Sequence, residues 1–490
     1  KKNKNKKRVY IENYFLCITY NKMSTQQQLA MMDSEGRVPP VQAVYSDLLG
    51  VSYPSKKSQV AFTASNGDSF DGAGKNQIEI PISIGTGQWC DFSNSYLRVK
   101  ITNTLANAAS WTLPHDIINR IQWLGTNSEV LEDLQGYAPL AAMLYAHQLG
   151  SDGQVYNNNL GENKIPNEYY TTAAAAAVNR QVCSDPSTAA NAVVMNNTLR
   201  GTSLTAGDKT ANPMGYGAQT HGTRDARGDH NKDALAQNST RTFCFPIISG
   251  ITSTGKYLPL GALKNRSLTL RITLERGARA FQNIAADTAI TYTVENVAFV
   301  ADVITMAETY NQKFMDMVRQ VGDVSIHYQT WKNYQDSLAA GAGTYNGLIP
   351  DSSRSLKSVF TVFNVAADEN QAYSNCPIYP RCTAYQYTIQ SETYPQSEVA
   401  IDNTATTLNR NQAFANLHIA LGQLGSISSR CCGPADAYVN RDDDRNSSTF
   451  ALGVCCEAHN KSSNLLESGI NLQNSSQPIR IKATVNPRVA

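Results

Sequence analysis

Few residues of this chain could carry chemistry, and several of them fall in one polar stretch near its middle. Arg227, Gly228 and Asp229 form the tripeptide bound by integrin-type adhesion receptors, within a segment rich in Asn, Ala, Gly, Thr and Ser. His221 and His230 flank it, but a long loop without periodicity is a poor place to preorganise catalytic groups. We interpret the tripeptide as a candidate receptor motif, with chance occurrence of three common residues as the alternative.

Two groups of residues have the types of metal ligands. Asp442–Asp444, between two arginines, could bind calcium, but the Gly and the distal Glu of a calcium loop are missing. The vicinal pairs Cys431-Cys432 and Cys455-Cys456 could face each other around a metal ion. The ten cysteines form no CxxC pair, which favours free thiols packed as small apolar side chains. We expect no metal site and no cofactor.

The sequence contains no motif of a known catalytic centre: GxSxG, HExxH and a phosphate-binding glycine loop are all absent. His147 falls on a helical apolar stripe, where a histidine is more often packed than used as a ligand. The paired carboxylates of a glycosidase would lie far apart along the chain, so that reading stays open. We expect a protein that is not an enzyme.

Composition indicates which elements must position these residues. Only 17% of the 490 residues are charged, against about 25% in an average protein, and 41% are hydrophobic. Many Asn, Ser, Thr and Tyr residues then indicate a β-rich protein with polar but uncharged outer faces. The net charge of +2 gives no overall field for nucleic acid or an anionic membrane. No apolar run reaches the roughly 20 residues of a membrane-spanning helix.

The clearest strand pattern lies at Ser267–Leu274, where four aliphatic residues alternate with Thr and Arg. Such alternation predicts a half-buried strand with one wet face. The preceding segment, Lys256–Leu263, is an apolar bend, since Pro259 and Gly261 interrupt regular pairing. Similar patterns predict further strands at 59–63, 77–84, 96–102, 117–124, 240–248, 290–306, 324–331, 355–363, 384–389, 450–454 and 478–484.

The order of strands, short helix, long loop and strands occurs twice. The short helices are predicted at 139–149 and 414–421, and a further helix at 307–318 would link the halves. We therefore expect an all-β chain of two tandem antiparallel sandwiches. The expected parts are an arm at 1–58, a first sandwich at 59–306 with a long insert at 150–240, the linker helix at 307–318, and a second sandwich at 319–490.

The two ends of the sequence are unusual. Residues 1–22 are basic and then briefly apolar, and Met23 looks like a natural start. We expect 1–22 to be upstream sequence rather than native, with a basic nucleic-acid-binding arm as the alternative. The last residues, 487–490, stop in mid-pattern, so we expect the second sandwich to be incomplete at its C-terminal end.

Five segments together resemble double jelly-roll major capsid proteins of the lineage that includes polinton-like viruses, adintoviruses, virophages and nucleocytoplasmic large DNA viruses. They are Tyr257–Leu263, Leu268–Leu274, Val294–Ile304, Ser353–Phe363 and Gln390–Ser397. Each motif is short, and their order and separation carry the specificity. The resemblance implies two tandem eight-stranded antiparallel jelly-roll sandwiches with short helices and long loop insertions.

The same resemblance implies a viral major capsid protein. Such a protein is a homotrimer that forms a pseudo-hexameric capsomer, contacts neighbouring capsomers and a single jelly-roll penton protein, and tiles an icosahedral shell around double-stranded DNA. It would be assembled inside the host cell and located in the virion, without sequence-specific nucleic-acid binding or a membrane span. The loops at 150–240 and 426–448 would form towers on the outer face.

Two other classes of protein stay open. A secreted tandem β-sandwich carbohydrate-binding protein or glycosidase would need a signal peptide, disulfides and a cluster of exposed tryptophans, whereas only Trp89, Trp111, Trp123 and Trp331 are present. A minor capsid or spike protein is the other alternative, and a monomeric or pentameric species would favour it.

Overall fold

The chain divides into two units, 1–55 and 56–490, and nearly all of the residues described belong to the second. The computed structural model describes residues 53–104, 109–110, 114–148, 195–197, 202–204, 238–261, 267–280, 282–283, 291–322, 325–338, 343–364, 380–403, 408–422, 450–458, 468–473 and 477–485.

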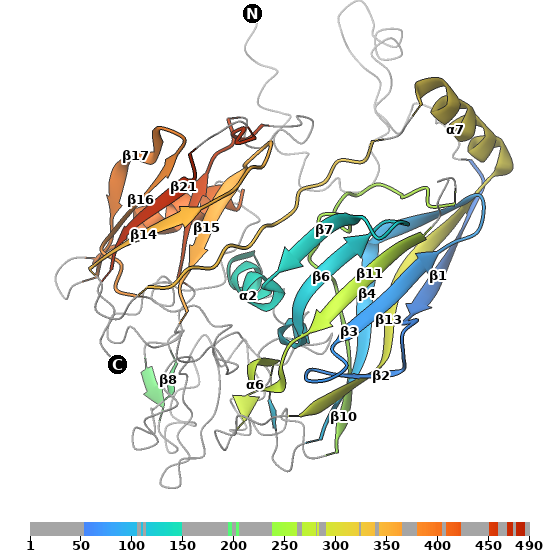
Figure 1. Cartoon of the computed structure of the whole chain (residues 1–490), viewed down its shortest axis with the longest axis horizontal. Helices are drawn as coiled ribbons and strands as arrows, with labels where there is room; N and C mark the ends of the chain where they lie inside the picture. The colour runs from blue at the N-terminus through green and yellow to red at the C-terminus, as the bar shows by residue number, and fades with distance from the viewer. Residues whose placement is uncertain are drawn as a thin grey trace, which may run out of the picture. The chain divides into compact units, whose positions relative to one another are not determined.

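The strands before the long helix α7 (Glu308–Val321) build two facing sheets, the N-terminal sandwich (Figure 1). The first sheet has the order β1 (Ser55–Thr63), β13 (Tyr292–Met306), β4 (Gln88–Asn103), β10 (Thr240–Phe245), with β2 (Ser69–Asp71) beside β13. The second has the order β3 (Gln77–Ser83), β11 (Ser267–Leu274), β6 (Ile118–Leu124), β7 (Val130–Gln135). With β2 left aside, these sheets join strands one, eight, three, six and two, seven, four, five in chain order, which is jelly-roll topology.

The core of the N-terminal sandwich follows from the strict alternation seen in the sequence. Strand β11 pairs antiparallel with β3, so that Leu270 lies opposite Ile80, and both side chains are completely buried. On the wet face of the same pair, Arg271 Nε donates to Glu79 Oε1 at 3.0 Å. Each fully buried aliphatic side chain stabilises the fold by about 1.5–3 kcal/mol. The strand predicted at 267–274 is confirmed residue for residue.

The predicted bend before β11 is also confirmed. Leu258 exchanges two backbone hydrogen bonds with Cys90 of β4, at 2.9 and 2.8 Å. A Cβ on Gly261 would lie 2.3 Å from the carbonyl oxygen of Gly85, so only glycine allows this approach of two backbones. The bend therefore fastens this segment of the chain to strand β4 of the opposite sheet.

The strands after α7 form the C-terminal sandwich. One sheet has the order β14 (Thr344–Ile349), β21 (Ile479–Thr484), β16 (Ala384–Ile389), β17 (Glu392–Ala400), and it faces the pair β15 (Ser358–Val362) and β20 (Ala451–Cys455). The order β14-β21-β16 and the pair β15-β20 repeat the jelly-roll arrangement of the first half. The fourth place differs: β17, the hairpin partner of β16, holds the position that β10 holds in the N-terminal sandwich.

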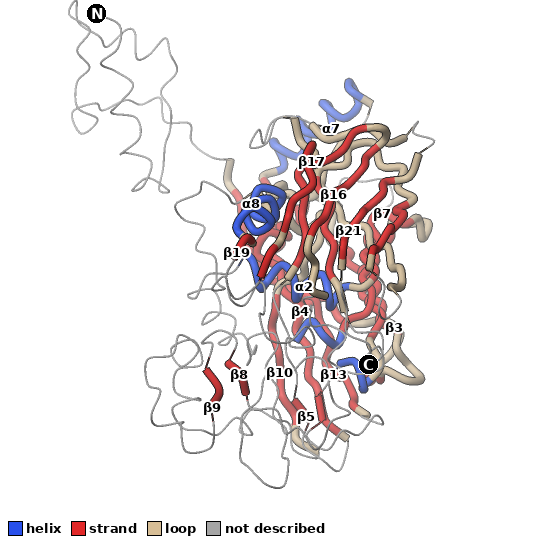
Figure 2. The backbone as a smooth tube through the Cα atoms, turned by 90° about the vertical axis from the view of Figure 1, so that its left-hand side faces the viewer, coloured by secondary structure: helices blue, strands red, loops and turns tan. Residues whose placement is uncertain are grey.

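The helices among the described residues are few and short (Figure 2). Helix α2 (Tyr137–Gln148), α7 and α8 (Asn411–Ala420) confirm the helices predicted at 139–149, 307–318 and 414–421 to within a few residues. Helix α7 ends at Gly322, whose φ of 93° lets its N–H reach the carbonyl of Val318. The remaining elements are β5 (Ala109–Ser110), η3 (Pro114–Ile117), β8 (Met195–Asn197), β9 (Thr202–Leu204), α6 (Gly277–Ala280), β12 (Gln282–Asn283), β18 (Asp402–Asn403) and β19 (Leu408–Asn409).

One predicted strand is wrong, and four strands of the main sheets were not predicted. Residues 325–331, part of the predicted strand 324–331, are extended but pair with no strand among the described residues. The strands missed are β2, β7, β14 and β17. Their patterns are weak for physical reasons: β7 buries Glu132, β14 contains Gly347, and β17 is mostly exposed and contains Pro395.

Candidate assembly site at the junction of the two sandwiches

The segment that follows α7, residues 325–338, is called the strap here, because it runs along the N-terminal sandwich toward β14 (Figure 1). Its Tyr328 hydroxyl donates to the carbonyl oxygen of Leu131 in β7. A Cβ on Gly250 would lie 2.0 Å from the carbonyl oxygen of Gln329, so the strap backbone lies directly on the turn at Gly250. These contacts fix the strap to the sandwich that precedes it.

A buried carboxylate, Glu132 of β7, holds this contact together. The residue is only 2% exposed. Its Oε1 accepts from the backbone N–H of Gly250 at 2.8 Å and from Thr330 Oγ1 of the strap at 2.9 Å. Its Oε2 accepts from Ser249 Oγ and from the backbone N–H of Ile251 at 3.3 Å. In the described part of the chain no ion pair involves this carboxylate, so hydrogen bonds alone compensate its burial.

Among the described residues, two partly buried side chains contact the hydrophobic cores of both sandwiches. Trp331 of the strap and Ile248 of the turn after β10 pack against the N-terminal core and also against the C-terminal core. The ring of Trp331 lies 5.5 Å from that of Phe360 in β15, measured between centroids. The two cores therefore meet through side chains in van der Waals contact, without a solvated linker at this point.

Helix α2 joins the same junction from the other side. Tyr137, in its first turn, is fully buried in the N-terminal core, and its hydroxyl accepts from the backbone N–H of Ile248 at 2.8 Å. Met143 and Leu144, farther along, belong to the C-terminal core. His147 is 2% exposed and lies 5.8 Å from His418 of α8, so the structure places it as a packed residue, as favoured from the sequence.

The far end of the strap is tied to the C-terminal sandwich by Asp351, which follows β14. Its Oδ1 accepts from Lys332 Nζ at 2.8 Å and from the Tyr334 hydroxyl at 3.0 Å. Burial would raise the pKa of Asp351, but hydrogen bonds from Lys332 and Ser353 outweigh it and hold the pKa below its ordinary value. For Tyr334, burial and the neighbouring carboxylate raise the pKa to about 12.

Acid should therefore loosen this end of the strap. Because the pKa of Asp351 is lowered on folding, its stabilisation is complete above the unfolded value of about 3.9 and is lost as pH falls through the folded value. We expect Asp351→Asn to cost on the order of 1–3 kcal/mol of unfolding free energy at pH 7 and less than that at pH 3. Urea unfolding at both pH values measures this, with the exposed Asp316→Asn as control. An equal loss at pH 3 and pH 7 would contradict the assignment.

Helix α7 is docked on the indole of Trp89, which contacts Tyr310, with ring centroids 5.7 Å apart, and Phe314. Trp89 of β4 lies edge-on to Phe314 with centroids 4.6 Å apart, and its Nε1 donates to Asn311 Oδ1 at 3.0 Å. Asn311 Nδ2 in turn donates to the carbonyl oxygen of Met306 at 3.2 Å. The C-terminal end of the helix is exposed to solvent, and Val321 there is 67% exposed.

We expect Asn311→Ala to free α7 from β4 at a cost of about 1–2 kcal/mol, because the indole N–H loses its acceptor and the helix loses its tie to Met306. Hydrogen exchange of the α7 amides should become faster by about tenfold or more. Gln312→Ala, on the exposed side of the same helix, is the control and should leave the exchange rates nearly unchanged. Equal effects of the two changes would show that the indole contact does not hold the helix.

Most of the sequence-predicted site residues lie outside the described residues. This applies to Arg227, Gly228 and Asp229, to the histidines that flank them, and to Asp442–Asp444. The receptor motif therefore stays a prediction. Of the vicinal cysteines only Cys455 and Cys456 are described, and no disulfide joins them to another described residue.

The described residues contain no group of three or more His, Cys, Asp or Glu side chains placed to hold a metal ion. Burial raises the pKa values of Cys90, Cys382 and Cys456 to about 12, which keeps these thiols protonated and unreactive. Among the helices described, none has the length and apolar character needed to cross a bilayer.

Sequence reasoning missed the residues that make the junction. Glu132 carried one usable signal, since alternation places it on the same face of β7 as the buried Leu134. A carboxylate on the buried face of a strand predicts a group that accepts several hydrogen bonds inside the protein, because burial without such partners is costly. Its partners are 117–119 residues away at the 249–251 turn and 198 residues away at Thr330, so no local pattern could have named them.

Comparison with known proteins rests on structure. No family model matches the chain, and no curated protein matches it. The Faustovirus major capsid protein is similar over 92% of this chain and 89% of its own, with a TM-score of 0.51 at 7% sequence identity. A PBCV-1 capsid protein fitted into a reconstruction of the virophage Sputnik is similar over 90% of this chain and 86% of its own, with a TM-score of 0.48 at 9% identity. The mavirus major capsid protein is similar over 92% and 87%, with a TM-score of 0.39 at 10% identity.

The likeness to the Faustovirus protein covers both sandwiches and agrees with the strand order. The fold is therefore the double jelly roll of viral major capsid proteins, and the predicted all-β fold class is confirmed.

Proposed function

We propose that this protein is a viral major capsid protein that trimerises into pseudo-hexameric capsomers, which tile an icosahedral shell around double-stranded DNA. The observation that carries the proposal is the junction: Trp331 and Ile248 pack against the cores of both jelly rolls of one chain. Three subunits can present six similar sandwiches in a hexagonal outline only if the two in each subunit keep a fixed relation. A shared core supplies that rigidity, because packed interiors do not deform continuously.

The proposal also assigns the parts of the chain. Residues 59–306 and 319–490 are the two jelly rolls, 307–318 the linker helix, and 150–240 an insert of the first roll that would form a tower. The partners are two further copies in the capsomer, neighbouring capsomers and a penton protein with a single jelly roll. The location is the virion, reached after assembly inside the host cell.

The test is the mass of the purified protein covering residues 23–490, by light scattering over a series of concentrations. We expect a trimer that persists on dilution, as closed symmetry with large buried interfaces requires. Negative-stain images of that species should show particles of hexagonal outline. A well-folded monomer at every concentration would contradict the proposal, and a pentamer would favour a minor capsid or spike protein.

A further inference from the structure

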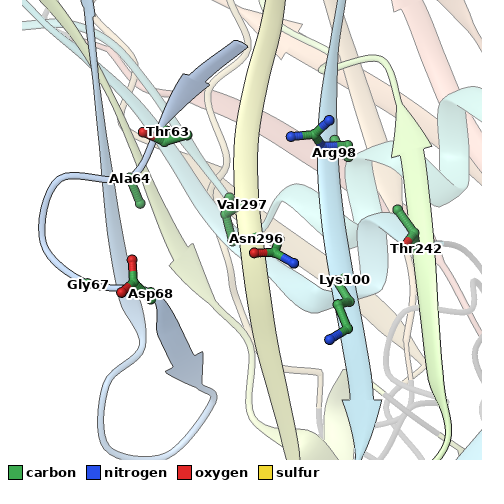
Figure 3. Close-up of a pocket in the computed structure, with 9 residues that line it drawn as sticks. All are labelled: Thr63, Ala64, Gly67, Asp68, Arg98, Lys100, Thr242, Asn296 and Val297. Carbon is green, nitrogen blue, oxygen red and sulfur yellow. The ribbon is translucent and has the colours of Figure 1, made fainter.

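A hollow of about 490 Å³ lies on the outer face of the first sheet of the N-terminal sandwich (Figure 3). Pockets that bind small ligands are commonly 300–1,000 Å³ in volume, so the hollow has room for one or two sugar-sized rings. Its polar walls come from four separate segments: Thr63 and Asp68 around the turn after β1, Arg98 and Lys100 of β4, Thr242 of β10, and Asn296 of β13.

The wall formed by β4 is cationic, and its Arg98 guanidinium has no carboxylate partner among the described residues. Arg98 is exposed and forms no ion pair with any described residue, whereas Arg120 and Arg271 are each paired with a carboxylate. Two residues along β4, Lys100 Nζ lies 3.0 Å from Glu295 Oε2. The planar fork of Arg98 is therefore free for a carboxylate, sulfate or phosphate that enters the hollow, and such a pair can be bidentate.

A bulge in β13 directs an amide toward the same place. The register between β13 and β4 shifts between Glu295 and Ala298, so that Asn296 and Val297 together lie opposite one residue of β4. Asn296 has a φ of 50°, a left-handed conformation that asparagine tolerates better than most residues. Figure 3 shows its amide directed toward β4, between Arg98 and Lys100. The bulge thus adds a neutral hydrogen-bonding group to the cationic wall.

The opposite wall carries a carboxylate. Asp68 is exposed, forms no ion pair with any described residue, and lies beside Gly67 in the wall formed by the turn after β1. Lys75 Nζ also lies at this wall, since a Cβ on Gly67 would be 2.0 Å from it. With Arg98, Lys100, Lys75, Asp68 and Glu295 counted, the formal charge of the hollow and its rim is +1. One excess positive charge gives a long polyanion such as DNA little affinity, since that affinity comes from the neutralisation of several phosphates. A carboxylate that faces the ligand suits hydroxyl donors instead.

We propose that this hollow binds an acidic sugar: the ligand's carboxylate or sulfate pairs with Arg98 and Asn296, and its hydroxyls donate to Asp68 and contact Thr63 and Thr242. This is a ligand site on the flank of the sandwich, separate from the junction, and it does not depend on the proposed capsid role. The recognition requires both an anionic group and hydroxyls on one small ligand, because Arg98 and the hydroxyl acceptor Asp68 lie on different walls.

The test measures binding of glucuronic acid to the purified full-length protein by ligand-observed NMR, with glucose as the matched neutral sugar. We expect a dissociation constant on the order of 1 mM for glucuronic acid and at least about tenfold weaker binding of glucose. Arg98→Gln should reduce glucuronic acid binding to the level of glucose. Arg480→Gln, an exposed arginine on β21, is the control and should leave it unchanged.

Two more variants separate a binding role from a folding role. Asn296→Gly suits the left-handed backbone at least as well, so the protein should stay folded while binding weakens about threefold or more. Asp68→Asn should weaken the binding of glucuronic acid, because its hydroxyls lose a carboxylate acceptor. The same change should strengthen the binding of inorganic sulfate, because a repelling negative charge is removed.

Three results would overturn the proposal. One is no detectable binding of glucuronic acid to the folded wild-type protein. The second is inorganic sulfate bound as tightly as glucuronic acid and unaffected by Asp68→Asn, which would indicate a simple anion site. The third is a short DNA duplex whose binding is lost in Arg98→Gln while the sugar does not compete, which would assign the hollow to nucleic acid.

Discussion

Replacement of Glu132 by Gln should lower the free energy of unfolding by roughly 2–4 kcal/mol. The carboxylate accepts hydrogen bonds from two backbone N–H groups of the turn, at Gly250 and Ile251, and from Thr330 of the strap. An amide of the same shape must point its NH2 group at some of these donors, and a buried donor that faces another donor loses its partner entirely. The change therefore weakens β7, the turn and the strap together.

Urea unfolding monitored by tryptophan fluorescence measures this loss. Trp123 is a suitable reporter, because its Nε1 donates to Ser249 Oγ at 2.9 Å inside the same cluster. The matched control is Glu129→Gln, the same chemical change on an exposed residue three positions earlier, which should stay within about 0.5 kcal/mol of the wild type. If both variants unfold at the same midpoint, the buried carboxylate does not hold the strap.

The elements that sequence reasoning placed correctly are those whose own residues decide their structure. Strands β11 and β16 alternate strictly between apolar and polar residues, and both were predicted with their bounds correct. Helices α2 and α8 were predicted from apolar residues at helical spacing. In these segments local pattern and tertiary environment agree, which is the condition under which sequence predicts structure.

The strap shows why the same reasoning fails elsewhere. Apolar and polar residues alternate from Val324 to Tyr328 in the sequence, and Ile326 and Trp331 both pack against the N-terminal core. These two residues are five positions apart, so they do not share one face of a regular strand, and the residues between them are exposed. Alternation in the sequence also does not report whether the backbone has a partner strand. Here the strap lies against a turn and an edge strand through side-chain and single carbonyl contacts, so an extended segment was mistaken for a strand.

The residues of the candidate site were harder to predict from the sequence than the fold. The receptor motif can be found by sequence alone, because it consists of three adjacent residues that match a known tripeptide. The junction is instead assembled from residues near positions 132, 249, 330 and 351. Each of these is ordinary in its local sequence. Only the antiparallel register and the jelly-roll crossings bring them together, and those are properties of the whole chain.

Replacement of Trp331 by Ala should separate the stabilities of the two sandwiches. The indole packs against both cores, so its loss should cost about 2–4 kcal/mol and leave a cavity where the cores meet. The N-terminal sandwich has the larger buried core and should keep its own stability. We therefore expect one cooperative urea transition in the wild type and two in Trp331→Ala, the first reporting the C-terminal sandwich.

Gln329→Ala, two residues earlier on the exposed side of the strap, is the control and should unfold as the wild type does. The stability of Trp331→Phe should lie between those of the wild type and Trp331→Ala, because a smaller ring keeps part of the contact with each core. A single transition at the wild-type midpoint for Trp331→Ala would show that the shared core does not couple the sandwiches. The mass of the same variant then tests the proposed function separately: two loosely joined sandwiches cannot present a fixed hexagonal outline, so trimers should be lost under conditions where both sandwiches remain folded.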